Sequence, residues 1–190
     1  MCEVEGVHEG GTDLYGEFRE QLVAAGHIIP LGVPGVVGRG GVFEHVIEQF
    51  ERLVTREARA LKPEVMRFPP VFSRAHYGRI NHLHNFPDLL GSVHSFAGGE
   101  KEHRAMSARF MAGEEWTDAL SPTEVMLIPA ACYPLYPTAT GTLPEGGRTV
   151  DLRSFVFRHE PSDDPARLQM FRQREVVRLG TAEQALSHRD

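Results

Sequence analysis

Two neighbouring segments of the sequence, residues 157–160 and 167–175, combine arginine, carboxylate and phenylalanine side chains. The polar residues 161–165 between them predict two strand-like segments joined by a turn-rich loop. An arginine donates two parallel hydrogen bonds to a phosphate, and a phenylalanine ring offers an apolar face to a nucleobase. The two segments are therefore a candidate nucleotide-binding hairpin. The alternative is a surface hairpin that is held by cross-strand ion pairs.

The composition is that of a soluble globular protein. The chain has 190 residues, of which 41% are hydrophobic and 24% are charged. Residues 1–12 are polar and glycine-rich, so we expect disorder there and one domain over residues 13–190. The net charge of −6 argues against a nucleic-acid surface, because such surfaces neutralise phosphates with lysine and arginine.

The cysteines and the termini bear on the compartment. Cys2 and Cys132 are the two cysteines, too few for a disulfide framework. No apolar stretch is long enough to cross a bilayer, and the acidic N-terminus lacks the basic start and apolar centre of a signal peptide. We therefore expect a cytoplasmic protein with reduced thiols.

Apolar spacing predicts the elements of the first part of the chain. A helix is expected over 14–25, with Gly26 as its C-cap, and a glycine-rich loop over 27–41. Its glycines follow no convincing strand, which disfavours a phosphate loop. The strongest helix covers 42–61, and an extended segment follows over 64–72. The apolar stripe of that helix consists of Val42, Val46, Ile47, Phe50, Leu53, Val54 and Ala58.

Three histidines, His76, His82 and His84, follow the extended segment. The spacing of His82 and His84 would place two imidazoles on one face of a strand, as in a metal site. A histidine-rich surface turn is the simpler interpretation. The pattern further on predicts helices over 100–112, 116–120 and 181–190, strands over 121–128 and 150–157, and a loop over 138–148.

Three motifs carry a resemblance to a known family. Residues 131–134 (Ala-Cys-Tyr-Pro), 157–162 (Phe-Arg-His-Glu-Pro-Ser) and 167–172 (Arg-Leu-Gln-Met-Phe-Arg) resemble the amino acid–[carrier protein] ligases. These are homologues of class II aminoacyl-tRNA synthetases, related to the seryl enzymes of methanogens. The resemblance runs from about Phe43 to the end of the chain. It implies an α+β fold with a mostly antiparallel sheet flanked by helices.

The resemblance also implies an activity and an ATP site. Such an enzyme activates a small amino acid of the glycine or alanine class with ATP and Mg²⁺. It then transfers the aminoacyl group to the phosphopantetheine thiol of a carrier protein, without tRNA. The ATP-binding residues would be Arg158 on the α-phosphate, Glu160 on the adenine amino group, Phe171 stacked on the base, and Arg167 with Leu168 in the hairpin loop. Arg158 would also be the catalytic residue, since catalysis of this kind is mainly positioning and charge stabilisation.

A zinc site is implied at Cys132 and Glu175. Related seryl enzymes carry a glutamate at the position of Cys132, and a thiolate beside a carboxylate suits Zn²⁺. The metal would bind the amino group of the substrate and select for it. The alternatives are an inert buried cysteine, and a Glu175 that pairs with Arg158 or Arg174.

Two further expectations follow from the resemblance. The family supplies a third zinc ligand, a cysteine, and a glycine-rich third motif with an ATP-binding arginine further downstream; the sequence to Asp190 has neither. We therefore expect a fragment or a truncated or degenerate homologue, inactive alone, whose alternative role is an ATP- or zinc-binding or dimerisation module. Residues 42–72 resemble motif 1, which implies a homodimer through this helix and strand; an ordinary helix–strand unit is the alternative.

Overall fold

The computed structural model describes residues 14–189, which form two compact units. The first unit contains residues 14–57 and 160–170, and the second contains residues 58–159 and 171–189. The disorder predicted for residues 1–12 falls outside the described part of the chain. Within 14–189, no helix has the length and apolar character needed to span a bilayer.

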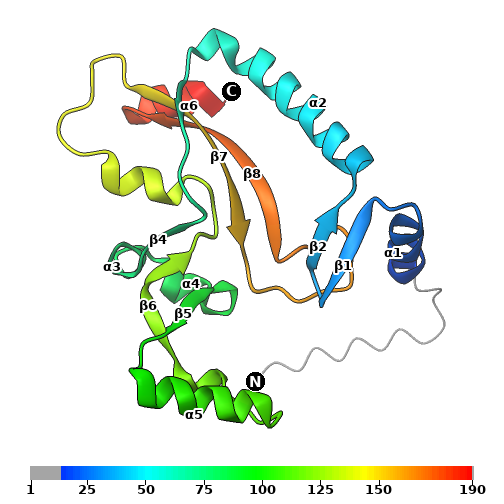
Figure 1. Ribbon diagram of the computed structural model, residues 1–190. Helices are drawn as coiled ribbons and strands as arrows, with labels where there is room; N and C mark the ends of the chain where they lie inside the picture. The colour runs from blue at the N-terminus through cyan, green and yellow to red at the C-terminus, as the bar shows by residue number, and fades with distance from the viewer. Residues whose placement is uncertain (1–13, 190) are drawn as a thin grey trace. The chain divides into compact units, whose positions relative to one another are not determined.

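The first unit consists of two helices and a hairpin (Figure 1). Its first helix ends as predicted, because Gly26 follows it with a φ of +67°, a left-handed conformation that glycine adopts without strain. This first helix and the hairpin lie side by side in Figure 1. The elements are α1 (Leu14–Ala24), β1 (Ile28–Val33), β2 (Val36–Arg39) and α2 (Gly41–Glu57).

Strands β1 and β2 occupy the region for which the sequence predicts a loop, so that prediction is wrong. The two strands are antiparallel, and their register leaves Pro34 and Gly35 as the turn. Proline followed by a left-handed glycine, here with a φ of +74°, is typical of a type II turn. Gln169 fixes this turn, donating its backbone N–H to the Gly35 carbonyl and its side-chain amide to the Pro34 carbonyl, each at 2.7 Å. The glycine pattern therefore serves a hairpin.

Helix α2 confirms the strongest helix prediction, although its end differs. The α-helix stops at Glu57, and a 3₁₀ turn, η1 (Ala58–Leu61), continues the chain into the second unit. Lys62 then takes a positive φ of 45° before Pro63. No residue of α2 is buried, and its apolar stripe is largely exposed. A strongly amphipathic helix with an uncovered apolar face is a candidate contact surface.

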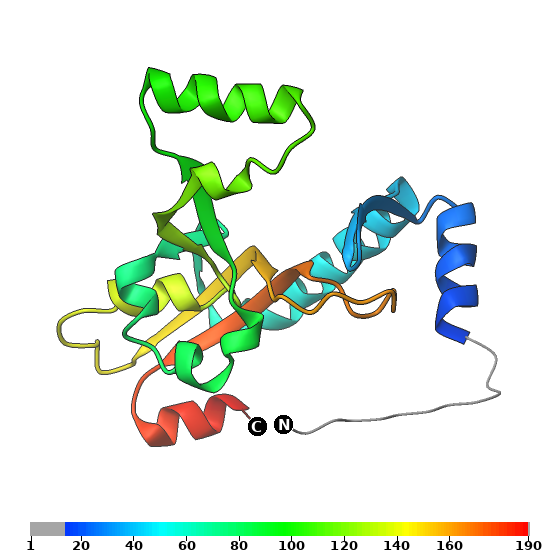
Figure 2. The same ribbon diagram turned by 90° about the horizontal axis from the view of Figure 1, so that it is seen from below.

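The second unit contains two three-stranded sheets, in the orders β3-β7-β8 and β4-β6-β5. β4 and β5 pair antiparallel with β6, whereas β3 pairs parallel with β7. Figure 2 shows α5 beyond the ends of β5 and β6, which it connects. The unit has the α+β character predicted from the sequence. After η1, its elements are β3 (Glu64–Met66), β4 (Val71–Ser73), α3 (Arg74–Tyr77), α4 (His82–Asn85), η2 (Pro87–Leu89), β5 (Ser92–Phe96), α5 (Glu100–Met111), η3 (Thr117–Ala119), β6 (Leu120–Leu127), η4 (Tyr133–Thr138), β7 (Arg148–Phe157), β8 (Met170–Leu179) and α6 (Ala182–Arg189).

Two local predictions for this unit need correction. The extended segment 64–72 divides into β3 and β4, which belong to different sheets, because Pro69 and Pro70 lack the amide donors that a continuous strand needs. The histidine region is helical at α3 and α4. Its His82 is buried and His84 is exposed, so the two imidazoles do not share a strand face.

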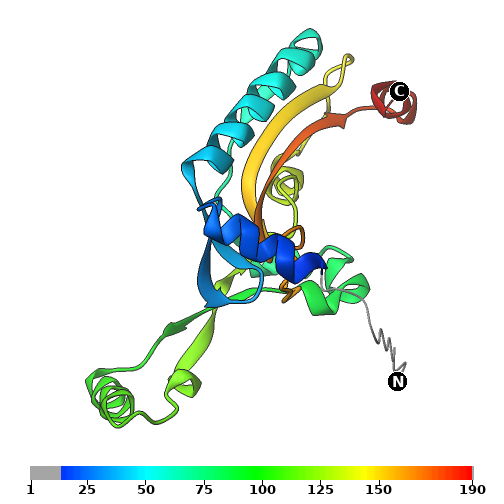
Figure 3. The ribbon, with the colours of Figure 1, turned by 90° about the vertical axis from the view of Figure 1, so that its right-hand side faces the viewer.

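The predicted hairpin is present, but its strands lie further from the loop than the expected segments 157–160 and 167–175. β7 ends at Phe157 and β8 begins at Met170, so the connecting loop covers residues 158–169 and contains most of the motif residues. Figure 3 shows β7 and β8 as a pair of long curved strands. The strand expected over 150–157 and the helix expected at the end of the chain are both confirmed as β7 and α6.

The core of the second unit lies between one face of the β7–β8 pair and the chain that follows β6. Val150, Leu152 and Val156 alternate along β7 and are almost fully buried, as expected for one face of a strand. They pack with Ile128, Ala131, Cys132 and Leu135, and with the partly buried Phe171, Val177 and Leu179 of β8. The core thus brings β8 against the residues around Cys132.

Candidate functional site

Alternate residues of β8 face the chain around Cys132. Phe171, Gln173 and Glu175 are two positions apart, so their side chains point to the same side of the strand. The Ala131 N–H donates to Oε1 of Gln173 at 3.0 Å, and the Cys132 N–H donates to Oε1 of Glu175 at 3.2 Å. β8 therefore fixes the backbone of residues 129–133, which we call the Cys132 segment.

Cys132 lies in a turn that precedes η4 and not on a strand. Pro129 and Pro134 flank this turn, and proline cannot continue a central strand. Glu175 does lie on a strand, β8. The turn brings Cys132 to the Glu175 carboxylate, which accepts from its N–H and bonds its thiol, even though 43 positions separate the two residues.

Burial governs the chemistry of Cys132. The residue is 8% exposed, and this burial raises the pKa of its thiol to about 11. A hydrogen bond with Tyr136 lowers this pKa, whereas the bond to Glu175 and the charge of its carboxylate raise it. The thiol is therefore protonated near neutral pH, and it is a poor nucleophile in this state. A divalent cation would have to displace the proton to bind here.

The pair Cys132 and Glu175 fits part of a zinc site. A thiolate and a carboxylate are both zinc ligands, and the two residues touch. Zinc sites normally have three or four protein ligands, and residues 14–189 contain no group of three His, Cys, Asp or Glu side chains that could hold a metal. The donor types fit zinc, and the set is incomplete within the described residues.

Arg158 and Phe171, predicted as phosphate clamp and base platform, come together in the second unit. The guanidinium carbon of Arg158 lies 5.5 Å from the centre of the Phe171 ring. Nε of Arg158 also donates to the Pro129 carbonyl at 3.1 Å, which ties the arginine to the Cys132 segment. A guanidinium over a ring face is stabilised by the ring quadrupole.

The other predicted ATP-binding residues lie in the part of the β7–β8 loop that belongs to the first unit, residues 160–169; they are Glu160, Arg167 and Leu168. Glu160 and Leu168 are half-buried and Arg167 is exposed. The loop turns at Asp164, whose carbonyl accepts from the Arg167 N–H at 3.0 Å. Their role at an ATP site stays a prediction.

Three further residues lie at the site: Tyr133 and Gln173, for which the sequence predicts no role, and His82, which it offers only as a metal ligand paired with His84. Tyr133 Oη lies 3.2 Å from Nδ1 of His82. Burial first, and then the charge of Arg158, lower the pKa of His82 below its ordinary value. Gln173 is two positions before Glu175, so strand alternation alone would have placed it on the same face. His82 has no comparable signal, because its contact with Tyr133 spans 51 positions.

The opposite face of the β7–β8 pair shows the ion-paired hairpin that the sequence analysis gives as the alternative. Arg174 pairs with Asp151, with Nη2 and Oδ2 2.5 Å apart, while the Glu175 carboxylate accepts from the Cys132 N–H. The guanidinium of Arg172 lies 5.7 Å from the Phe155 ring centre. One face of this hairpin therefore carries the ion pairs of the surface-hairpin interpretation, and the other carries the candidate site.

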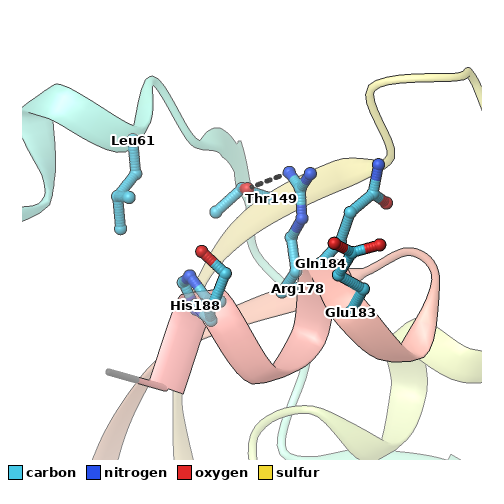
Figure 4. Close-up of a pocket in the computed structure, with 7 residues that line it drawn as sticks. Leu61, Thr149, Arg178, Glu183, Gln184 and His188 are labelled. Carbon is cyan, nitrogen blue, oxygen red and sulfur yellow. Dashed lines mark hydrogen bonds between the residues drawn. The ribbon is translucent and has the colours of Figure 1, made fainter.

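A separate pocket of about 450 Å³ lies between η1, β7, β8 and α6 (Figure 4). Arg178 lines this pocket and donates to Thr149 Oγ1 at 2.9 Å and to the Gly146 carbonyl at 2.5 Å. None of the predicted site residues lines it. The lining residues are Leu61, Thr149, Arg178, Glu183, Gln184, Ser187 and His188.

Two curated proteins of Bradyrhizobium diazoefficiens match this chain in sequence. Amino acid–[acyl-carrier-protein] ligase 2 is 45% identical and ligase 1 is 43% identical, each over 162 residues and 84% of this chain. The chain spans about half the length of these relatives, 48% and 49% respectively. No protein-family model matches it. The resemblance that the three motifs indicate is thus confirmed over most of the chain.

Two solved structures share the fold. The M. kandleri seryl-tRNA synthetase, crystallised with A. aeolicus tRNASec, has a TM-score of 0.76 at 19% identity and covers 97% of this chain and 38% of its own. Giardia lamblia prolyl-tRNA synthetase, in complex with prolyl-adenylate, has a TM-score of 0.68 at 17% identity, over 93% of this chain and 33% of its own. The chain therefore has a class II synthetase fold, as predicted.

Proposed function

We propose that this chain is part of an enzyme that activates a small amino acid with ATP and transfers it to the phosphopantetheine thiol of a carrier protein. The aminoacyl-adenylate would be the intermediate. The names of the two ligases that are 43–45% identical support this reaction. The observation that carries the proposal is the shared location of Arg158, Phe171, Cys132 and Glu175 on one face of β8 and beside the Cys132 segment.

Arg158 is the proposed clamp on the α-phosphate of ATP, which enters with Mg²⁺. The Pro129 carbonyl and the Phe171 ring hold its guanidinium before any ligand is bound, so little ordering is needed when the phosphate arrives. Attack on the α-phosphate increases negative charge there, and a fixed cation stabilises that charge. Phe171 would offer its ring to the adenine, with Glu160, Arg167 and Leu168 as further ATP contacts.

Cys132 and Glu175 are the proposed recognition site for the substrate amino group, as two ligands of a zinc ion. When bound, the metal would act as a Lewis acid that accepts the lone pair of a neutral amino group. The hydrogen bond between the Cys132 thiol and the Glu175 carboxylate supports the proposal, and a third ligand from outside the described residues is required. The residues of this chain orient the thiol through the Gln173 and Glu175 bonds to the backbone of the segment.

We also propose that the protein is a cytoplasmic homodimer and that α2, followed by residues 58–72, contributes to its interface. Val42, Val46 and Phe50 of α2 are 60–62% exposed, and Leu53 is 40% exposed. Four apolar side chains on one helix face form a patch of the kind that protein interfaces cover. In a homodimer, the stripe of one copy would pack against the same stripe of the second copy, and both stripes would be buried.

Amino-acid-dependent ATP–pyrophosphate exchange tests the activity. We expect exchange by the intact protein with glycine, alanine or serine, and a loss of about 30- to 1000-fold in Arg158→Ala, which corresponds to about 2–4 kcal/mol. Arg104→Ala is the matched control, since Arg104 pairs with Glu100 on the exposed surface of α5. ATP binding without any exchange by the wild type would instead support the inactive binding module.

A further inference from the structure

His82 is a buried histidine whose ring is enclosed by aromatic side chains. It is 7% exposed, and the neighbouring Tyr77 is 1% exposed. The ring of Tyr77 and that of Tyr133 each meet it edge-on, with centroids 5.7 Å away, and the Phe86 ring lies at 5.3 Å. These contacts leave the imidazole little freedom to rotate, so it is a rigid support for a hydrogen bond.

One ring nitrogen of His82 is used and the other is not. Nδ1 bonds the Tyr133 hydroxyl at 3.2 Å, whereas Nε2 has no hydrogen-bond partner among residues 14–189. Burying a polar nitrogen without a partner costs free energy. If His82 served packing alone, its replacement by phenylalanine would not lower the stability of the protein. The bond to Tyr133 is therefore the feature of His82 that an apolar ring could not replace.

The bond ties the Cys132 segment to a second element, α4, in addition to β8. Gln173 and Glu175 hold the backbone of Ala131 and Cys132 from that strand. Tyr133 is the next residue of the segment, and His82 holds its side chain from α4. The segment is thus fixed between two elements that are separate in the chain. Loss of either support would let the backbone of Cys132 move relative to the Glu175 carboxylate.

We propose that His82 is a positioning residue for the Cys132 segment: through Tyr133 it fixes the thiol beside the Glu175 carboxylate, where the substrate amino group is to be recognised. The second half of this statement rests on the proposed function. The first half concerns only the local order of the segment. Because burial and Arg158 lower the pKa of His82, its ring is neutral near pH 7, and one nitrogen is available to accept.

The thiol of Cys132 reports the order of the segment without any substrate. It is 8% exposed, so a thiol reagent reacts only when the segment opens. Within the 190-residue chain the two cysteines are Cys2 and Cys132, so the Cys2→Ser variant of this chain has one thiol to follow. With EDTA present to remove metal, the rate of reaction with a disulfide reagent measures this opening. The measurement requires neither ATP nor a carrier protein.

Four variants in the Cys2→Ser background test the proposal. His82→Phe keeps an aromatic ring and removes both nitrogens, Tyr133→Phe removes only the hydroxyl, and a double variant combines them. We expect each single change to raise the thiol rate by about twofold to tenfold, which is the effect of one net hydrogen bond, and the double variant to match the singles. His82→Asn places an amide near the Nδ1 position and should bring the rate back toward that of the parent.

A second measurement separates positioning from general stability. His82→Phe removes an unpaired buried nitrogen together with the bond to Tyr133, so the two effects offset and its Tm should stay close to that of the parent, although the thiol rate rises. In the exchange assay the KM for the amino acid should rise while the KM for ATP stays constant. Unchanged thiol rates in both His82→Phe and Tyr133→Phe would overturn the proposal. Raised rates in a protein whose wild type shows no exchange would support the positioning of the segment and refute the proposed function.

Discussion

The buried ion pair between Asp151 and Arg174 joins β7 to β8, and its removal is expected to destabilise the second unit more than any surface charge does. Nε of Arg174 lies 3.2 Å from Oδ1 of Asp151, and Nη2 lies 2.5 Å from Oδ2. The two side chains are 11% and 5% exposed. Arg67 lies further away, with Nη1 3.6 Å from the same carboxylate, and donates to the Asp151 carbonyl at 2.7 Å.

Asp151→Asn removes the charge that two arginines share. Removing one member of a buried ion pair typically costs about 3–5 kcal/mol, since the other charge stays buried without a partner. We expect about 3 kcal/mol here, at the lower end, because the amide oxygen of asparagine still accepts a hydrogen bond. This is a large part of the free energy of unfolding of a typical domain, which is about 5–15 kcal/mol. Arg174→Met should cost less, because Arg67 still faces the carboxylate.

Urea unfolding followed by the fluorescence of Trp116 measures these changes, since Trp116 is the single tryptophan and lies in the same unit. The matched control is Glu64→Gln, which removes the ion pair of Arg148 with Glu64 between β7 and β3. That pair has a distance of 2.8 Å, but its side chains are 26% and 50% exposed, so a change of about 0–1 kcal/mol is expected. If Asp151→Asn costs no more than this control, burial does not strengthen the pair and the reasoning is wrong.

The intact protein is expected to hold about one zinc ion per protomer, and Cys132→Ser should lose most of it; equal zinc in both proteins by elemental analysis would exclude Cys132 as a ligand. Phe50→Glu should convert a dimer to a monomer in light scattering, because it places a charge on the apolar stripe of α2. Phe110→Glu, at a phenylalanine that is also exposed but lies on α5, should leave the dimer intact. In metal-free Cys2→Ser protein, the pH dependence of alkylation should give a thiol pKa of about 11, and Glu175→Gln should lower it by removing a carboxylate charge that opposes the thiolate. A wild-type value near the ordinary 8.5 would contradict the burial argument.

The sequence predicts the long elements of this fold better than the short ones. Helix α2 and strand β7 follow from apolar residues at regular spacing, a signal that sums over many positions. The sequence does not predict the β1–β2 hairpin, because its prolines and glycines favour a loop more strongly than its short β-branched pairs favour strands. Its turn is stabilised by Gln169, which is 135 positions away from Pro34 along the chain. Contacts of that separation are invisible to local patterns.

The candidate site is predictable to a similar extent and for similar reasons. Arg158, Phe171, Cys132 and Glu175 could be chosen from residue types and motifs, and the structure brings Arg158 to Phe171 and Cys132 to Glu175. Their functional roles remain proposals. The support from His82 was not predictable, because no spacing rule relates α4 to the Cys132 segment. The sequence marks His82 only as a candidate metal ligand, whereas the fold places it in a hydrogen bond with Tyr133.

The period of two along β8 explains how one strand serves both stability and the proposed chemistry. Arg172 and Arg174 point to the face where Phe155 and Asp151 hold the strands together. Gln173 and Glu175, at the positions between and after them, point to the Cys132 segment. A carboxylate at the site thus needs no arginine from its own strand, and its charge stays available to a cation or an amine. A shift of the strand register by one residue would exchange the two faces and bring arginines against a buried thiol. The ion pairs on the first face therefore also fix which side chains reach the second.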